Sequence, residues 1–391
     1  MKEIIDHEQN KKKKTSPWAT IAAIAFIAIL IIIITIALPR EKSVGTKITL
    51  SANPQTSEQI KQTIAMKQQK YPQAIELVSP DYYHNLPNNE TNITIQSLVG
   101  KKVILLDFWT YSCINCQRTL PYLNSWYDKY QGEGLEIIGI HTPEFEFEHD
   151  PTNVENALKQ YGIEFPVVQD NEYQTWTAYN NHYWPHKYLI DIDGFVVYDH
   201  IGEGGYDETE QEIQTLLAER AQRLNQTDAM MSAGISQNLT QIQENISFAQ
   251  IQTAEIYAGY KLDRGQFGNP QGHTPDQTIN YALPLVRGPN LFYLSGDWRN
   301  DPEAMISVAD NDTIVLTYTA KQINIVAGLE QTASATTAPA TLAIKIDGQS
   351  EPSVNVTGQG LYTLMDADSY ATHTIEITVP KGLQFYTFTF G

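Results

Sequence analysis

The stretch Asp107-Phe-Trp-Thr-Tyr-Ser-Cys113-Ile-Asn-Cys116 holds both cysteines of this 391-residue chain, in a single C-x-x-C motif. Such a pair is typical of redox chemistry rather than packing. Residues 103–108 (VILLDF) predict a buried strand, and the sequence from Gln117 onward has helical character. At this strand-to-helix junction, the free N–H groups and the dipole of the helix favour a thiolate on Cys113. Cys116, one turn further on, is placed to resolve a mixed disulfide.

A C-x-x-C motif can also be half of a zinc site or a permanent structural disulfide. Structural zinc usually needs four Cys or His ligands, and no second C-x-x-C or close histidine pair follows here. A disulfide across the motif would close a very small loop and would constrain the unfolded chain little. The sequence therefore favours a redox pair and indicates no metal site.

The residues around the motif resemble the thioredoxin superfamily, specifically its membrane-associated TlpA/ResA-like branch. Asp107 and Trp109 match the strand that carries the buried acid and the tryptophan of that family. Pro121 falls where the family kinks its active-site helix. The resemblance is closest to the C-terminal region of DipZ-type proteins and covers roughly residues 80–391. It rests on segments 109–118 (WTYSCINCQR), 141–145 (HTPEF), 183–185 (YWP), 188–191 (YLID) and 388–391 (FTFG).

One departure from the DipZ pattern concerns the N-terminal side. DipZ-type proteins carry a multi-helix electron-transfer domain there, whereas this chain has one uncharged apolar segment at residues 18–38. At about 1.5 Å per residue, a helix of this length crosses a bilayer core. A cleaved signal peptide is the alternative, but the apolar run is longer than usual and no convincing A-x-A site follows it. We expect a retained transmembrane anchor.

Charge indicates the orientation of that anchor. Residues 1–17 hold five lysines and three acids, although the whole chain has a net charge of −19. The positive-inside rule puts residues 1–17 in the cytoplasm. We therefore expect a single-pass protein of the cytoplasmic membrane, with the bulk of the chain extracytoplasmic. Its acidic character argues against nucleic acid as a partner.

The sequence beyond the anchor predicts two domains joined by a linker. Residues 39–80 read as a spacer with a helix at 57–70, and residues 81–223 alternate strands and helices. The elements expected in this α/β thioredoxin-like domain are strands 103–108, 135–140, 187–192 and 195–200, and helices 118–130, 154–161 and 208–223. Asp193-Gly194 between the last two strands is a hairpin signal.

The C-terminal part changes to a period of two. Residues 224–247 are polar and read as a linker, and residues 248–391 contain short alternating strands with turn signals. This pattern predicts an antiparallel all-β sandwich. By resemblance it is a jelly roll similar to carbohydrate-binding modules. Apolar residues at its start indicate docking on the redox domain as an alternative role: Ile251, Ile256, Tyr257 and Tyr260.

The resemblance implies a role for each candidate site residue. Cys113 would attack, Cys116 would resolve, and Asp107 would move protons to and from the resolving thiol, with burial raising the pKa of Asp107 toward neutrality. A strand-end carboxylate satisfied by hydrogen bonds is the alternative for Asp107. Pro185 would be the cis-proline facing the C-x-x-C, and Glu144 would tune the thiol pair. The candidate substrate-contacting residues are Trp184, Trp109, Ile114 and Asn115. Weaker candidates for a functional role are His141, Arg118, Trp126 and Trp176. We expect the two tryptophans to be core residues.

These observations predict a thiol-disulfide oxidoreductase that reduces disulfides in envelope proteins or in cytochrome c maturation. It would need no cofactor besides the Cys113–Cys116 disulfide. The expected partners are disulfide-containing clients, a CcdA-like membrane electron donor and an envelope glycan. The alternatives are a disulfide isomerase or oxidase, a copper-binding thioredoxin-fold chaperone, a peroxide reductase, and a glycan-binding protein that stacks sugars on Trp298 and Tyr293.

Overall fold

The computed structural model describes residues 56–87, 90–226, 246–330 and 339–391. Within these residues, no helix is long and apolar enough to cross a membrane. The apolar segment 18–38 and most of the linker 224–247 lie outside the described residues. The anchor and the linker therefore stay predictions.

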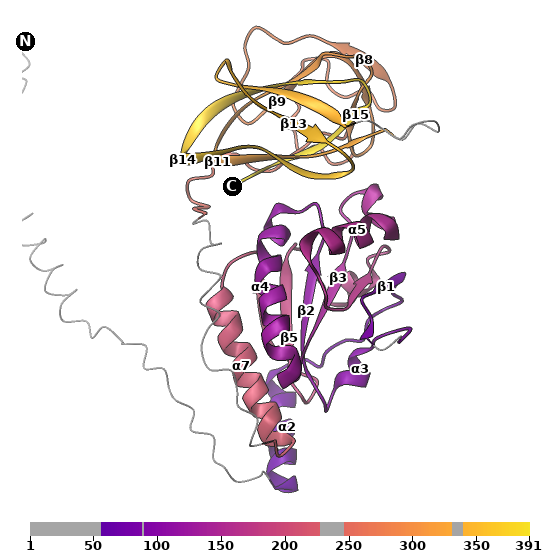
Figure 1. The fold of residues 1–391 in the computed structure, drawn as a ribbon, viewed down its shortest axis with the longest axis vertical. Helices are drawn as coiled ribbons and strands as arrows, with labels where there is room; N and C mark the ends of the chain where they lie inside the picture. The colour runs from indigo at the N-terminus through magenta and orange to yellow at the C-terminus, as the bar shows by residue number, and fades with distance from the viewer. Residues whose placement is uncertain (1–55, 88–89, 227–245, 331–338) are drawn as a thin grey trace, which may run out of the picture. The chain divides into compact units, whose positions relative to one another are not determined.

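The first part of the described chain is built on a mixed six-stranded sheet with strand order β1-β4-β3-β2-β5-β6. Figure 1 labels β1, β2, β3 and β5 of this sheet. Its strands are β1 (Tyr82–His84), β2 (Val103–Trp109), β3 (Leu135–His141), β4 (Val167–Gln169), β5 (His186–Ile190) and β6 (Val196–Ile201). Its helices are α2 (Ser57–Lys70), α3 (Ile95–Leu98), α4 (Ile114–Tyr130), α5 (Pro151–Tyr161), α6 (Gln174–Ala178) and α7 (Tyr206–Arg223), with 3-10 turns at Gln131–Glu133 and Glu146–His149. The parallel pairing of β2 with β3 and the β5–β6 hairpin are confirmed.

The side chains of β2 alternate between two apolar clusters on the opposite faces of this sheet. Val103 and Leu105 join the cluster that also contains side chains of α4, α5 and α7. Ile104 and Leu106 join the cluster that contains side chains of α3 and α6. Asp107 has the same parity as Leu105, so its side chain points toward the face that α4 covers.

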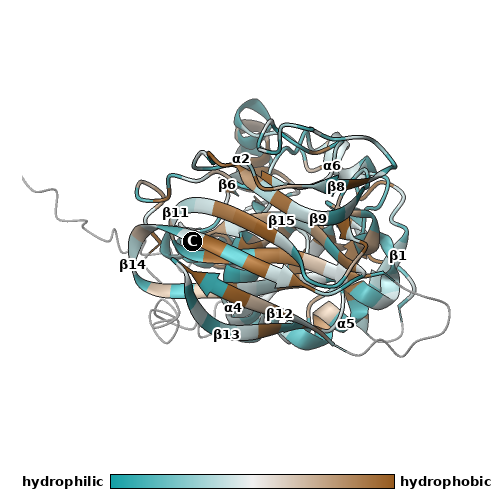
Figure 2. Cartoon of the chain, turned by 90° about the horizontal axis from the view of Figure 1, so that it is seen from above, coloured by the Kyte–Doolittle hydropathy of each residue, from teal (hydrophilic) through white to brown (hydrophobic). Residues whose placement is uncertain are grey.

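The second part is rich in β structure, as predicted, and contains a nine-stranded sheet. Its strands are β7 (Ile256–Tyr257), β8 (Thr278–Tyr281), β9 (Phe292–Asn300), β10 (Met305–Ser307), β11 (Asp312–Leu329), β12 (Ala340–Ile346), β13 (Gln349–Val356), β14 (Gly360–Val379) and β15 (Leu383–Phe390). Hydrophobic residues are frequent along β9, β11 and β15 (Figure 2). Because β11 pairs with both β9 and β15, and β10 also pairs with both, these four strands form a closed circuit of hydrogen bonds.

The β-rich domain shares buried apolar side chains with the first part. Tyr257, Ile306 and Tyr386 belong to the same cluster as residues of α4 and α5. Of the residues predicted to dock, Tyr257 makes this contact, whereas Ile256 and Ile251 pack into the core of the β-rich domain. The Tyr260 hydroxyl donates a hydrogen bond to the Asp276 carboxylate. The described residues of both parts belong to one compact unit.

Candidate functional site

The two cysteines lie where β2 ends and α4 begins. Cys113 is the N-cap residue of α4, with extended backbone angles, and its sulfur accepts the backbone N–H of Cys116 at 3.4 Å. The helix therefore starts earlier than the predicted residue 118, because the thiol itself satisfies one of the free N–H groups of the first turn. This contact aims the positive end of the helix dipole at the Cys113 sulfur.

Exposure separates the roles of the two thiols. Both cysteines are free, Cys113 is half-buried, and Cys116 is only 1% exposed. Burial raises the pKa of Cys116 well above its usual value, and the adjacent Cys113 and Asp107 raise it further. Cys116 is thus a protonated thiol at neutral pH, whereas Cys113 is the sulfur that a client disulfide can reach. The attacking role of Cys113 and the resolving role of Cys116 stay predictions, which this difference in exposure favours.

Asp107 is fully enclosed beneath the cysteines. Its carboxyl is 1% exposed, and burial raises its pKa from 3.8 to about 7, although the nearby Lys187 lowers it. One carboxyl oxygen, Oδ1, has no hydrogen-bond partner among the described residues. The alternative of a strand-end carboxylate satisfied by hydrogen bonds therefore does not fit. A pKa near 7 suits a group that exchanges protons with a thiol.

Lys187 is a site residue that the sequence did not reveal. It lies opposite Asp107 in the antiparallel register of β2 and β5, and it is fully buried. Its Nζ donates to the Gly202 carbonyl at 3.0 Å. Burial lowers the pKa of Lys187, while Asp107 and Cys116 raise it. In the sequence, the only sign of this role is that Lys187 closely follows the pair Trp184-Pro185.

The peptide bond between Trp184 and Pro185 is cis, as the resemblance implied. The β2–β5 register pairs Phe108 with His186, which puts Pro185 level with Trp109 at the edge where the cysteine motif begins. Pro185 is buried, and its carbonyl already accepts the Gly202 N–H at 2.8 Å. The half-buried Trp184 donates its indole N–H to Thr142.

The substrate-contacting residues divide into two groups. Ile114 and Asn115 are half-exposed beside the thiols, as a client-contacting role requires. Trp109 is wrong for that role, because it is completely buried and its ring packs edge-on against His141 at 5.2 Å. The physical reason is the alternation along β2, which sends Trp109 into the same core as Leu105.

The segment after β3 carries Glu144 and a second acid that the sequence analysis missed. Glu148 is fully buried, and its carboxylate accepts four hydrogen bonds. One oxygen takes the backbone N–H and the hydroxyl of Ser112, at 3.2 and 2.7 Å. The other takes the N–H groups of Glu144 and Phe145, at 2.6 and 3.1 Å. Glu148 therefore ties the residue preceding Cys113 to the segment that carries Glu144.

Glu144 itself contacts the β-rich domain. Tyr257 donates its hydroxyl to the Glu144 carboxylate at 2.5 Å and lies 2.9 Å from Glu255. Burial and the charge of Glu255 raise the pKa of Glu144 well above its usual value. The role predicted for Glu144 thus involves a domain contact that the sequence did not show.

The residues with weaker claims are mostly structural. His141 is fully buried, and burial lowers its pKa to about 3, so it is a neutral ring packed between Trp109 and Tyr111. Trp126 is a core residue as predicted, whereas Trp176 is half-buried against Trp184. Arg118 pairs with Glu203 at 3.3 Å and donates to Gln322 at 2.7 Å.

One of the alternative functions, glycan binding, loses the residues that motivated it. Trp298 and Tyr293 are 0% and 4% exposed, so neither offers a face on which a sugar stacks. Among the residues that the structure describes, no group of three His, Cys, Asp or Glu side chains is arranged to hold a metal ion.

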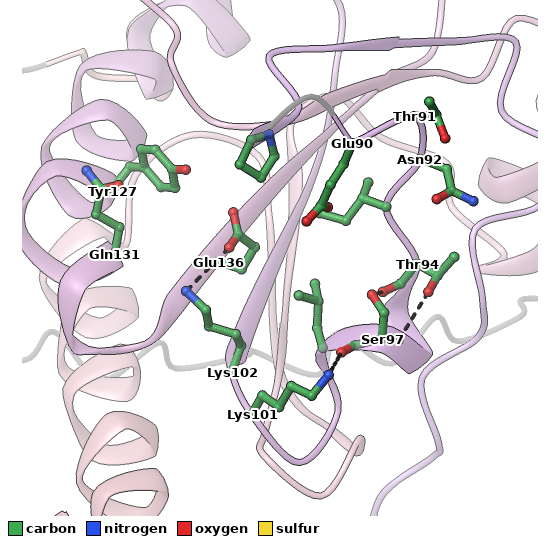
Figure 3. Close-up of a pocket in the computed structure, with 13 residues that line it drawn as sticks. Glu90, Thr91, Asn92, Thr94, Ser97, Lys101, Lys102, Tyr127, Gln131 and Glu136 are labelled. Atoms are coloured by element: carbon green, nitrogen blue, oxygen red, sulfur yellow. Dashed lines mark hydrogen bonds and ion pairs between the residues drawn. The ribbon is translucent and has the colours of Figure 1, made fainter.

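A large pocket lies away from the thiols. Its volume is about 810 Å³, and Figure 3 shows it lined by Lys101 and Lys102, just before β2, and by Glu136 of β3, which pairs with Lys102 at 3.6 Å. The cysteines follow the other end of β2, roughly 20 Å away at about 3.3 Å per residue. A smaller groove of about 360 Å³ adjoins the motif and is lined by Ile114, Pro121 and Tyr206, among others.

Two stretches of the chain match known protein families. Residues 79–199 match the family described as AhpC/TSA, and residues 253–391 match the family described as thioredoxin like C-terminal domain.

Three relatives are similar to this chain. Protein DipZ of Mycobacterium tuberculosis is 36% identical over 308 residues, which are 78% of this chain and 41% of that protein. The thiol-disulfide oxidoreductase YkuV of Bacillus subtilis is 30% identical over 127 residues, 32% of this chain and 85% of that protein. The thiol-disulfide oxidoreductase ResA of Bacillus cereus is 34% identical over 134 residues, 32% of this chain and 75% of that protein. This chain thus spans less than half of the DipZ relative and most of the other two.

Proposed function

Because this chain belongs to the thioredoxin-like thiol-disulfide oxidoreductases, with relatives that include DipZ and ResA, we propose that it is a membrane-anchored, extracytoplasmic disulfide reductase. Its clients are envelope proteins with non-native disulfides or apocytochromes whose cysteines must be reduced. It needs no cofactor besides the Cys113–Cys116 pair.

The observation that carries this proposal is the contrast between the two thiols. The Cys113 sulfur is accessible and faces the helix N-terminus, while Cys116 is buried above Asp107. In the first step, the Cys113 thiolate attacks one sulfur of the client disulfide and releases the other as a client thiolate. A mixed disulfide between Cys113 and the client results.

The second step resolves the mixed disulfide. Asp107 takes up the proton of Cys116, and the Cys116 sulfur attacks Cys113. The bond between Cys113 and the client breaks, the client leaves as a dithiol after protonation, and the Cys113–Cys116 disulfide forms. Two electrons have passed to the client, so a donor must return two electrons to the pair. We propose a CcdA-like membrane protein as that donor, since the thiols are to work outside the cytoplasm.

The anchor is proposed from the sequence of the first 38 residues. An uncharged apolar segment at 18–38 follows the lysine-rich tail, and this arrangement supports a cytoplasmic N-terminus with the redox domain outside. The groove beside Ile114 suits an apolar stretch of a client, because Pro121 and Tyr206 line it next to the thiols.

For the β-rich domain we propose a jelly-roll topology and a supporting role at the redox domain. Tyr257 and Tyr386 pack in the core that α4 shares, which favours this role. Binding of an envelope glycan is the second candidate role, but the burial of Trp298 and Tyr293 removes its stacking surface. Binding to wall material by the full chain would favour the second role.

Single-cysteine variants of the full chain test the redox proposal. Cys113→Ser should abolish reduction of insulin disulfides, and Cys116→Ser should accumulate mixed disulfides with clients. A Cys113→Ser variant with unchanged exchange activity would refute the proposal. Peroxide consumption that depends on Cys113 without disulfide exchange would favour a peroxide reductase.

The reduction potential of the pair tests the direction of electron flow. We expect a value near or below that of thioredoxin, about −270 mV, since a reductase must hold its electrons weakly. A value near that of DsbA, about −120 mV, would make the protein an oxidase. The potential is measured by equilibration with glutathione or dithiothreitol buffers.

A further inference from the structure

Tyr257 of the β-rich domain occupies a position between two acids. Its hydroxyl donates to Glu144 at 2.5 Å and lies 2.9 Å from the Glu255 carboxyl. A phenol has one proton to donate. The second short contact therefore needs a proton on a carboxyl group. Burial raises the pKa of both Glu144 and Glu255, which favours a proton on one of the two.

Several other charged or titratable groups face this cluster. From the β-rich domain, the Arg264 guanidinium lies 4.5 Å from the centre of the Tyr257 ring and lowers the pKa of both acids. From the redox domain, the charge of Glu148 raises the pKa of Glu144. The charge of Glu144 in turn raises the pKa of the Tyr173 phenol. Arg264 is the one cation among these neighbours, and the hydrogen bond from Tyr257 lowers the pKa of Glu144 more than Arg264 does.

Hydrogen bonds connect this cluster to the attacking thiol. Glu148 accepts the backbone N–H of Glu144 with one oxygen and two bonds from Ser112 with the other. Ser112 immediately precedes Cys113. A shift of the Glu144 backbone therefore reaches Cys113 through the single rigid carboxylate of Glu148.

Apolar contacts hold the same segment from the side of the β-rich domain. The rings of Phe145 and Phe147 lie 5.2 and 4.9 Å from the ring of Tyr386. Phe145 is also 6.4 Å from the ring of Tyr257. The segment that carries Glu144 is thus packed against the β-rich domain and hydrogen-bonded to the cysteine loop.

We propose that Tyr257 is a positioning residue of the redox site, through which the β-rich domain sets the protonation of Glu144 and the geometry of the Cys113 loop. This inference rests on the proposed thiol-disulfide exchange activity. It assigns the β-rich domain a part in the chemistry although that domain contains no cysteine. A change at Tyr257 then alters exchange without touching Cys113, Cys116 or Asp107.

The test replaces Tyr257 by phenylalanine in the full chain. Tyr257→Phe keeps the ring but removes the donor to Glu144, a hydrogen bond to a charged group. We expect the exchange rate with a small disulfide to fall about tenfold. The low-pH limb of its pH profile should move up by about one pH unit, because Glu144 then binds a proton more readily.

Tyr281→Phe is the matched control. Tyr281 is also buried in the β-rich domain, and its hydroxyl bonds to Asn300 and Gly272 of that domain. This variant also loses a phenol hydrogen bond, here to neutral acceptors, and should keep the wild-type pH profile. Thermal unfolding of both variants shows whether each is folded at the assay temperature.

Glu255→Gln provides a second comparison. The Tyr257 hydroxyl donates to Glu144, so the carboxyl proton of the cluster lies on Glu255. Glutamine is neutral like that protonated acid, and its NH₂ group can donate to the Tyr257 oxygen, so this variant should keep the low-pH limb of the wild type. Equal loss of activity in Tyr257→Phe and Tyr281→Phe, or an unchanged pH profile in Tyr257→Phe, would overturn the inference. Cys113→Ser tests the exchange activity itself, and its result does not depend on the Tyr257 variant. The proposed function and the role of Tyr257 can therefore fail separately.

Discussion

Asp107 lies opposite Lys187 in the antiparallel register of β2 and β5, and both side chains are shut off from solvent. The two do not form an ion pair within 4 Å, since the lysine Nζ is bonded to the Gly202 carbonyl instead. The carboxyl therefore has a cation nearby, but its Oδ1 has no hydrogen-bond partner among the residues that the structure describes. This arrangement leaves the pKa of Asp107 near 7, between the values of a solvated and an isolated buried acid.

Replacing Asp107 by asparagine should change the pH dependence of stability. The pKa of Asp107 is about 7 in the folded protein, above the ordinary 3.8 expected for the unfolded chain. Between about pH 4 and 7, the folded protein keeps a proton that the unfolded chain has lost. Stability therefore falls as the pH rises through this window, by up to about 4 kcal/mol for about three pKa units.

Urea unfolding at pH 4 and pH 8 measures this effect. Asp107→Asn should be more stable than the wild type at pH 8 and gain little at pH 4. The gain at pH 8 will be below the upper limit, because asparagine leaves Lys187 without its carboxylate. Exchange activity should nevertheless drop on the order of 10²-fold with loss of the proton acceptor. Equal pH dependence in both proteins would contradict the assigned pKa.

Lys187→Met tests the other member of the pair. Methionine has a similar length and no charge, and the cation that lowers the pKa of Asp107 is removed. The pKa of Asp107 should rise above about 7, so the rate of exchange should reach its maximum at a higher pH. A pH–rate profile of the resolving step, followed by client release from the mixed disulfide, provides the measurement. No movement of the profile would show that Lys187 serves only to bind the Gly202 carbonyl.

The sequence predicted the elements that hold the thiols but not the partners brought to them by the fold. Residues 103–108 are apolar enough to predict a central strand, and Cys113 was correctly placed at the start of a helix. Lys187 becomes a neighbour of Asp107 only through the register of β2 with β5, and no local pattern specifies that register. The prediction that Trp109 contacts clients was wrong. It followed the resemblance to the family, although Trp109 lies two places along the strand from Asp107 and four from Leu105 and so shares the buried face of β2 with them.

The buried acid Glu148 was also beyond local reasoning. The stretch Glu144-Phe-Glu-Phe-Glu148 shows alternating acids that read as an exposed loop. A 3-10 turn at Glu146–His149 instead directs Glu148 inward, where four donors compensate its charge. Contacts between domains, such as that of Tyr257 with Glu144, depend on tertiary packing for the same reason.

Glu148→Gln should both destabilise the protein and slow exchange. The amide oxygen of glutamine can replace one carboxylate oxygen, but its NH₂ group then faces two N–H donors. Loss of hydrogen bonds to a charged acceptor costs about 1.5–3 kcal/mol. Chemical unfolding and insulin reduction give the two readouts.

Glu155→Gln is the control for Glu148→Gln. Glu155 pairs with Lys159 at 2.6 Å on the exposed face of α5, so its replacement should leave stability and activity nearly unchanged. If Glu148→Gln also leaves stability and activity nearly unchanged, the hydrogen bonds that Glu148 accepts from Ser112 and Glu144 are unimportant for the cysteine loop.

The orientation of the chain in the membrane is the last expectation that can be tested directly. Residues 11–14 are four consecutive lysines that precede the uncharged segment 18–38, and the residues that follow it are strongly acidic overall. Lysines next to an apolar segment are retained on the cytoplasmic side. Protease added to intact spheroplasts should therefore digest the redox and β-rich domains and leave a small membrane-bound fragment with the N-terminal tail. Digestion of the tail in intact spheroplasts would reverse the orientation, and a soluble mature protein that begins near Arg40 would show a cleaved signal instead of an anchor.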